Sequence, residues 1–216
     1  MKKKYLDDIE LISEKLKHLP KLWDGKSSIL ELKEANYNWK QMEWFGFYFE
    51  LLVKKSLNDH FQFPGDKIGN VKFDMKRLIN WDLKSHAIKS NSHLLILNDT
   101  ESMQKSVELN KYHGILIALC DVEYNDNDRS FQKWHTELKG GLSSYELKRI
   151  ERTSFSRYRK TRAELVELIF LIINQQNISK LGLFSQGRNS NSKPRPSKYL
   201  LQLEDLDKFE NYKIKY

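Results

Sequence analysis

An α/β fold is the class that the sequence predicts, and three observations lead to it. Apolar residues at helical spacing mark the N-terminal segments, and short apolar runs between turn residues mark extended segments further on. The two kinds of segment follow one another in the order helix, three strands, helix and strand. With 216 residues, the chain is long enough for one well-packed domain with an appended lobe.

Two helices are predicted before the first strand. Residues 1–20 carry apolar side chains close to helical spacing, and Pro20 ends the pattern. A polar turn is expected at residues 24–28. The segment Trp39–Leu57 is rich in aromatic residues and predicts a second helix, which the Pro64-Gly65 pair separates from the first extended segment.

Extended segments come next, and a helix interrupts them. Asp99 or Thr100 can cap a helix that runs to about Tyr112. The predicted strands, the first two of which resemble a hairpin, are Val71–Leu78, Ile79–Ile88, Leu94–Leu97 and Ile115–Val122.

The composition changes after Gly140-Gly141. A basic helix is expected to begin at Ser143 or Ser144. Thr161 and Glu164 fit a capping box, which predicts a further helix over residues 161–176. Short strands at residues 181–184 and 199–203 would then flank a long hairpin loop. We therefore divide the chain into residues 1–138, with the N-terminal helices and the core, and residues 139–216, a basic region packed on that core as part of one compact domain.

The charge distribution indicates a polyanionic partner. The formal net charge is +8, and residues 139–198 contain 13 Lys/Arg against four Glu and no Asp, a net charge of +9. The rest of the chain sums to −1. A basic block on an otherwise balanced protein is the electrostatic pattern expected for nucleic-acid binding.

Other classes of protein fit less well. No apolar run is long enough to span a membrane, and the N-terminus lacks the features of a signal peptide. The single cysteine, Cys120, lies in an apolar run and cannot form an internal disulfide. These features favour a cytoplasmic protein. The chain has no Walker-type phosphate loop and no dinucleotide fingerprint, so no nucleotide cofactor is expected.

Asp74, Asp82 and Lys84 are the candidate catalytic residues. In extended chain alternate side chains share a face, so Asp82 and Lys84 project together. If the two hairpin segments pair, Asp74 and Asp82 can converge on one cation. Glu50, which ends the aromatic cluster FGFYFE, can add a third carboxylate. An oxygen-only site of this kind suits Mg²⁺, which lowers the pKa of a bound water, while Lys84 orients that water.

A rival register exists. The pattern acid–any residue–Lys occurs six times in the chain, and Asp66, Asp74 and Lys76 have the same spacing as the favoured trio. Asp66 follows Pro-Gly in a turn, where the direction of its side chain is poorly fixed, so the Asp74–Asp82–Lys84 register is preferred.

At these residues the chain resembles a known family. An acid followed by (Asp/Glu)-x-Lys on adjacent strands, read in VKFD…NWDLKSHA, is similar to the PD-(D/E)xK nucleases, and among them to the type II restriction endonucleases. Phe73, where the motif has proline, is a departure. The resemblance implies a restriction-endonuclease-like core, a mixed sheet flanked by helices, across roughly residues 39–122. It also implies Mg²⁺-dependent hydrolysis of DNA, with Asp74, Asp82 and Glu50 as metal ligands.

Two basic segments are predicted to bind double-stranded DNA. The first, an acid-free loop with two prolines, is expected to read base edges in a groove, and the second to contact the phosphate backbone. The residues assigned to DNA binding are Gln186, Arg188, Asn189, Asn191, Lys193, Arg195 and Lys198 in the loop, and Arg157, Arg159 and Lys160 before it.

The expected function is therefore a type II restriction enzyme, and a palindromic site would favour a homodimer. Two alternatives stay open. One is a non-catalytic nucleic-acid-binding protein, which needs the basic block but not the convergence of acids and lysine. The other is a repair or junction-resolving nuclease with the same core and a surface that reads shape.

Overall fold

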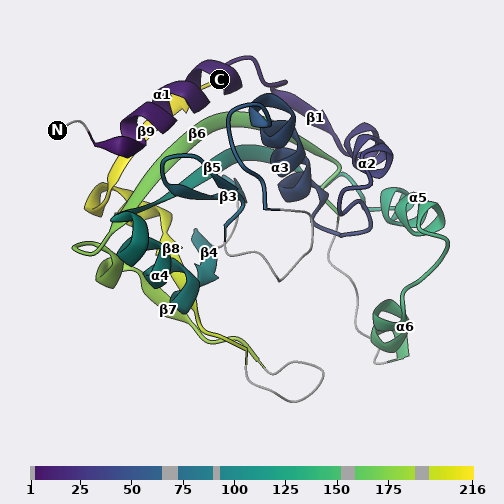
Figure 1. The fold of residues 1–216 in the computed structure, drawn as a ribbon. Helices are drawn as coiled ribbons and strands as arrows, with labels where there is room; N and C mark the ends of the chain where they lie inside the picture. Colours follow the sequence, from purple (N-terminus) through teal and green to yellow (C-terminus); the bar gives the residue numbers. More distant parts are fainter. Residues whose placement is uncertain (1–2, 65–72, 90–92, 152–158, 188–194) are drawn as a thin grey trace.

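A curled mixed sheet flanked by helices organises the molecule, and this confirms the predicted α/β class. The computed structural model describes residues 3–64, 73–89, 93–151, 159–187 and 195–216. Helices α1 and α3 cover one face of the sheet, and α4 with a smaller second sheet covers the other (Figure 1).

The main sheet has the order β1-β6-β5-β3-β2, and β9 pairs with β6 beside β1. The neighbours β3 and β5 are parallel, and every other pair in this sheet is antiparallel. The strands are β1 (Leu22–Asp24), β2 (Met75–Lys76), β3 (Asn80–Ala87), β5 (Tyr112–Glu123), β6 (Arg162–Asn174) and β9 (Glu210–Lys215).

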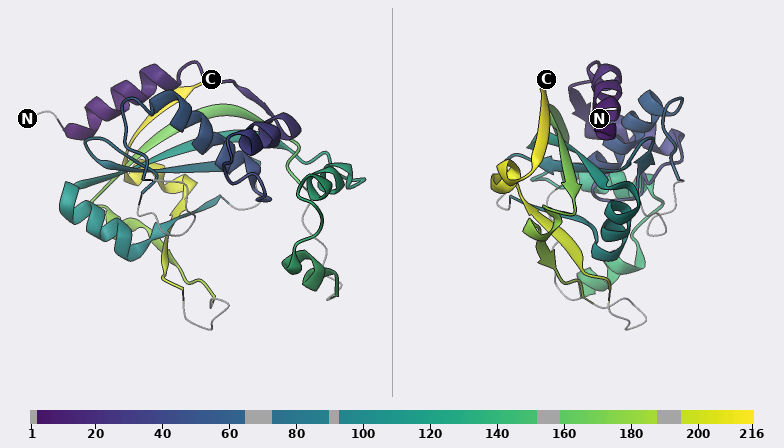
Figure 2. Two further views of the ribbon diagram at one scale, coloured as in Figure 1. Left: turned by 45° about the vertical axis from the view of Figure 1, so that its right-hand side comes forward. Right: turned by 60° about the vertical axis from the view of Figure 1, so that its left-hand side comes forward.

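The second sheet is antiparallel and has the order β4-β8-β7. Its strands β7 and β8 form the predicted hairpin, which extends below the main sheet on the same side as α6 (Figures 1 and 2). The strands are β4 (Leu94–Asp99), β7 (Gly182–Phe184) and β8 (Lys198–Gln202).

The helices lie mainly in the first two thirds of the chain. Asp99 caps α4 as predicted, because its side chain accepts a hydrogen bond from the Ser102 amide at 2.8 Å. The helices are α1 (Lys4–Leu16), α2 (Gly25–Glu34), α3 (Trp44–Leu57), α4 (Thr100–Asn110), α5 (Ser130–Leu138) and α6 (Ser144–Glu151), with the 3₁₀ turns η1 (Ile178–Lys180) and η2 (Leu203–Lys208). No helix in the described ranges is long and apolar enough to cross a membrane.

Two hydrophobic cores lie on opposite faces of β5 and β6. Leu116 and Ala118 pack with α1, α2 and α3, whereas Ile115 and Ile117 pack with α4 and the second sheet. Because successive side chains of a strand point to opposite faces, a strand buried on both faces must be apolar at nearly every position. This requirement explains the continuous apolar runs of both strands.

The prediction of a helix over residues 161–176 is wrong. This segment is β6, a long strand in the middle of the main sheet. A continuous apolar run gives no period that separates a buried strand from a buried helix, and the capping-box match at Thr161 is misleading. Thr161 instead donates hydrogen bonds to the Glu123 carbonyl at the end of β5. Since β6 follows residue 138, the two predicted regions of the chain share one sheet.

The order of elements around the site is close to the prediction, with one change. The hairpin β2–β3, the helix α4 and the strand β5 form, although β2 covers only Met75–Lys76 of the predicted strand Val71–Leu78. The predicted third strand forms as β4, but it pairs with β8 in the second sheet and not with the main sheet. The sequence patterns missed β1, α2, α5 and β9, and α2 begins within the turn predicted at residues 24–28.

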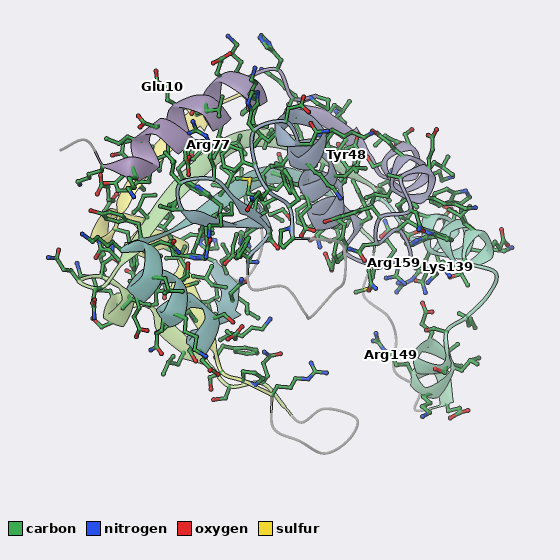
Figure 3. All side chains as sticks on the ribbon, in the orientation of Figure 1. Glu10, Tyr48, Arg77, Lys139, Arg149 and Arg159 are labelled. Carbon is green, nitrogen blue, oxygen red and sulfur yellow. The ribbon has the colours of Figure 1, made fainter. Side chains whose placement is uncertain are left out.

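Asp8 of α1 connects the N-terminal helix to the hairpin. Its carboxylate is fully buried and accepts hydrogen bonds from the Leu78 and Ile79 amides, each at 3.3 Å, and from the Trp81 indole at 3.0 Å. Arg77, which lies beneath α1 in Figure 3, completes an ion pair with Asp8 at 3.1 Å. One buried carboxylate thus fixes the turn between β2 and β3.

Asp8→Ala should destabilise the fold by at least about 3 kcal/mol, because it leaves buried donors and a cation without their acceptor. Glu14→Ala, on the same helix with the same change in charge, should cost less than about 0.5 kcal/mol, since Glu14 is exposed. Urea unfolding of both variants measures the difference. Equal midpoints would show that Asp8 does not hold the turn.

Candidate active site

The hairpin brings the two predicted aspartates near each other. Asp74 directly precedes β2, and its amide donates to the Trp81 carbonyl of β3 at 3.0 Å. Its carboxylate lies close enough to Asp82 and Lys84 to interact with both electrostatically. The Asp74 carboxylate is held there by the Leu83 amide at 2.7 Å.

Lys84 lies on the same face as Asp82, two residues along β3. In the parallel register Asp82 is beside Ile115 and Lys84 is beside Ile117, both of which face α4 and the second sheet. The ammonium group of Lys84 donates to the side-chain oxygen of Asn98 in β4 at 3.1 Å. The site therefore lies between the main sheet and the second sheet.

A buried polar chain fixes one oxygen of Asp82. The carboxylate is fully buried, and its Oδ2 lies 2.8 Å from Nε2 of the buried His113. On the other side of the imidazole, Nδ1 lies 2.9 Å from the Ser106 hydroxyl, which also accepts a hydrogen bond from Asn80. The second oxygen, Oδ1, is enclosed and has no hydrogen-bond partner in the described part of the chain. A buried carboxylate oxygen without a donor needs a water or a cation, and it is the hard oxygen ligand that a divalent cation such as Mg²⁺ takes.

Glu50 reaches the cluster from α3. A Cβ at Gly46, one turn earlier, would lie 3.2 Å from the Ser85 hydroxyl, so this glycine lets the helix approach β3 closely. The Glu50 carboxylate accepts a hydrogen bond from the Tyr37 hydroxyl at 2.8 Å. Burial and the nearby Asp74 carboxylate raise the pKa of Glu50 to about 7.

The charges at the site act on one another. Burial raises the pKa of Asp74, and the neighbouring Asp82 adds to that rise. Burial alone would lower the pKa of Lys84, but the three carboxylates Asp74, Asp82 and Glu50 outweigh it and raise the pKa, so Lys84 stays cationic. The cluster therefore holds more acidic groups than its single lysine can neutralise.

The residues fit a divalent cation in their chemistry, although they do not form a closed cage. In the described ranges no three His, Cys, Asp or Glu side chains are grouped so as to hold a metal ion together. Asp74 and Asp82 interact electrostatically, Oδ1 of Asp82 has no hydrogen-bond partner among the described residues, and Glu50 is near enough to interact with both carboxylates. These hard oxygen donors suit Mg²⁺, which keeps several waters in its shell.

The described end of the predicted loop that contains Lys198 lies near this cluster. Lys198 of β8 is half-buried and lies across from Asp99 of β4 in the register of the second sheet. Burial, together with the nearby Lys84 and Arg195, lowers the pKa of Lys198. The Gln186 amide donates to the Pro196 carbonyl at 3.3 Å and joins the two sides of the hairpin. The remaining predicted readers, Arg188, Asn189, Asn191 and Lys193, lie outside the described residues.

The second predicted DNA-binding segment is less accessible than the prediction requires. Arg159 is only 4% exposed, and Lys160 forms an ion pair with Glu43 while its ammonium group lies over the Phe45 ring. These two side chains therefore do not form an open clamp for the DNA backbone. Arg157 lies outside the described residues.

The structure describes only part of the alternative site, Asp66, Asp74 and Lys76. Asp66 lies outside the described residues, whereas Lys76 is in β2, paired with Asn80. Sequence patterns also missed the polar residues that support the favoured site, namely His113, Ser106, Asn98 and Tyr37. His113 is the second residue of the apolar strand β5, so a lone polar side chain at the start of a buried strand was the available signal.

Comparisons of the chain with protein-family models, with curated proteins and with solved structures found no match. The chemistry of the cluster is therefore the basis for a functional assignment.

The raised pKa of Glu50 predicts a dependence of stability on pH. A glutamate in the unfolded chain titrates near pH 4.5, whereas Glu50 in the fold titrates near pH 7. The fold thus retains a proton between these values, and its stability should fall as the pH rises through this window. Glu50→Gln should remove a large part of the fall in Tm between pH 5 and pH 7.5 in EDTA.

The exposed Glu34 at the end of α2 provides a matched control, because Glu34→Gln should leave the pH dependence of the wild type intact. If Glu50→Gln and Glu34→Gln show the same slope of Tm against pH, the Glu50 carboxyl does not hold a proton in the fold at neutral pH.

Proposed function

We propose that the protein is a Mg²⁺-dependent endonuclease that cleaves double-stranded DNA at a specific site, with a restriction-endonuclease-like core. The observation that carries the proposal is the grouping of Asp82 and Lys84 on one face of β3, with the Asp74 carboxylate held near them by the Leu83 amide and with a buried oxygen of Asp82 left without a donor among the described residues. A structural ion pair would satisfy both oxygens of such a carboxylate.

Each residue has a separate role in this proposal. Asp74, Asp82 and Glu50 would hold Mg²⁺, which when bound supplies Lewis-acid stabilisation of phosphoryl charge and a water of lowered pKa. Lys84, kept cationic by the carboxylates, would orient the attacking water and offset negative charge on the phosphate. His113 would keep the Asp82 carboxylate in one orientation, so that Oδ1 stays directed at the cation.

The placement of the basic region supports DNA as the substrate. The β7–β8 hairpin and α6 extend from the same side of the main sheet, and Asp82 and Lys84 face that side (Figures 1 and 2). The base of the hairpin carries Lys198 next to Lys84. A duplex bound along this side would meet the predicted loop and the cluster together, and two copies would suit a palindromic site.

Cleavage of supercoiled plasmid tests the proposal. The wild type should produce discrete fragments in Mg²⁺ and none in EDTA. Asp82→Asn and Lys84→Met should each lower the rate by at least about 100-fold, as expected for a lost metal ligand and a lost cation beside the attacking water, while DNA binding in a gel-shift assay is retained. Lys76→Met should leave the rate unchanged in the favoured register and abolish it in the rival one.

Lys89→Met and Asp121→Asn are matched controls, because these residues form an exposed ion pair at 2.7 Å near the same strands and should keep full activity. Full activity of both Asp82→Asn and Lys84→Met would refute the assignment. Specific DNA binding without cleavage by the wild type would favour a non-catalytic binding protein, and preferential cleavage of branched DNA would favour a junction-resolving nuclease.

A further inference from the structure

A pocket of about 590 Å³ lies away from the carboxylate cluster, between the loop that precedes α3 and the α5–α6 connection. Four of its side chains are cationic and one is acidic. Figure 3 shows Lys139 and Arg159 at the α5 side and Arg149 on α6. The charged residues that line the pocket are Lys40, Lys139, Arg149, Arg159 and Glu146.

Arg159 is the unusual member of this set. Its side chain is 4% exposed, and the contact between its Nη2 and Glu146 is long, at 3.5 Å. Its Nε and Nη1 atoms are enclosed and lack hydrogen-bond partners among the residues described. Buried guanidinium groups normally have their donors satisfied, because an unpartnered buried donor is costly. Two nitrogens of Arg159 are thus without an acceptor in the described part of the chain.

Glu146 does not supply the missing acceptors. One of its oxygens accepts hydrogen bonds from the amide and the hydroxyl of Ser143, at 3.0 and 2.8 Å, and so caps α6. The other oxygen is shared between Lys139 and Arg159, each at 3.5 Å. Asp126 and Glu43 also act electrostatically on Arg159, but neither lines the pocket, whose charged lining of four cations and one acid keeps an excess of positive charge.

We propose that this pocket binds a phosphate monoester group, with Arg159 as its principal ligand and Lys139 as its partner. A dianion matches the charge excess, and its oxygens supply acceptors for Nε and Nη1 of Arg159, which have none among the described residues. The volume also suits a nucleotide-sized ligand. This site is separate from the carboxylate cluster and does not depend on nuclease activity.

Thermal unfolding in inorganic phosphate tests the proposal. A ligand that binds the folded state raises Tm in a saturable manner. Tm of the wild type should rise by several degrees in phosphate relative to chloride at matched ionic strength, and this rise should be absent in Arg159→Met. Removing a poorly paired buried charge seldom unfolds a protein, so this variant should fold. Lys139→Met provides a second variant with the same expected loss.

Arg162→Met is the matched control, because Arg162 is three residues away, exposed outside the pocket and paired with Glu123 at 2.7 Å. It should keep the full phosphate response. Phosphate also stabilises proteins without a site through exclusion from their surface, so equal rises in the wild type, Arg159→Met and Lys139→Met would overturn the proposal.

The source of the phosphate group is identified by a second titration. A single-stranded oligonucleotide with a 5′-phosphate is compared with the same strand carrying a 5′-hydroxyl. Tighter binding of the phosphorylated strand, lost in Arg159→Met, would identify the end of a nucleic acid as the ligand. Equal binding of both strands, together with an Arg159-dependent response to inorganic phosphate, would identify a small phosphorylated molecule instead.

Discussion

The buried carboxylate of Asp8 is the contact on which the arrangement of the site depends. It accepts hydrogen bonds from two amides of the β2–β3 turn and from the Trp81 indole, and it pairs with Arg77. These contacts fix the turn and the first residues of β3 against α1. Asp74 and Asp82 flank that turn, and the Leu83 amide holds the Asp74 carboxylate, so a shift of one residue in β3 would turn Asp82 to the other face. The N-terminal helix thereby sets the geometry of residues about 70 positions away in the chain.

The site brings several buried carboxyl groups together, and their mutual repulsion does not stabilise the fold. Burial and mutual repulsion raise the pKa values of Glu50 and Asp74, and the Asp82 oxygen that His113 does not bind has no donor in the described structure. Such groups are costly in an isolated fold and are typical of sites whose ligand carries the opposite charge. The pocket around Arg159 shows the reverse arrangement, with four cations and one acid in its lining and two guanidinium nitrogens without an acceptor among the described residues. Both features favour ligands, a cation at one site and an anion at the other.

Local patterns predicted the elements nearest the site and failed where burial on two faces decides the structure. The hairpin, the aromatic helix α3 and the Asp99 cap of α4 follow from side-chain alternation, helix formers and a local hydrogen bond. A helix prediction fails for the strand β6 because its apolar run carries no readable period. The partner of β4 is about 100 residues away in β8, and the contact of Asp82 with His113 spans two strands, so neither could be read from neighbouring residues.

The carboxylates on the β2–β3 face form, in our proposal, a site for a divalent cation. Titration with Mn²⁺, with the free ion followed by electron paramagnetic resonance, tests this site without any assumption about the substrate. The wild type should bind Mn²⁺, and Asp82→Asn, which alters the carboxylate whose Oδ1 lacks a partner among the described residues, should weaken binding at least about tenfold. Equal Mn²⁺ affinity of the two proteins would contradict the assignment.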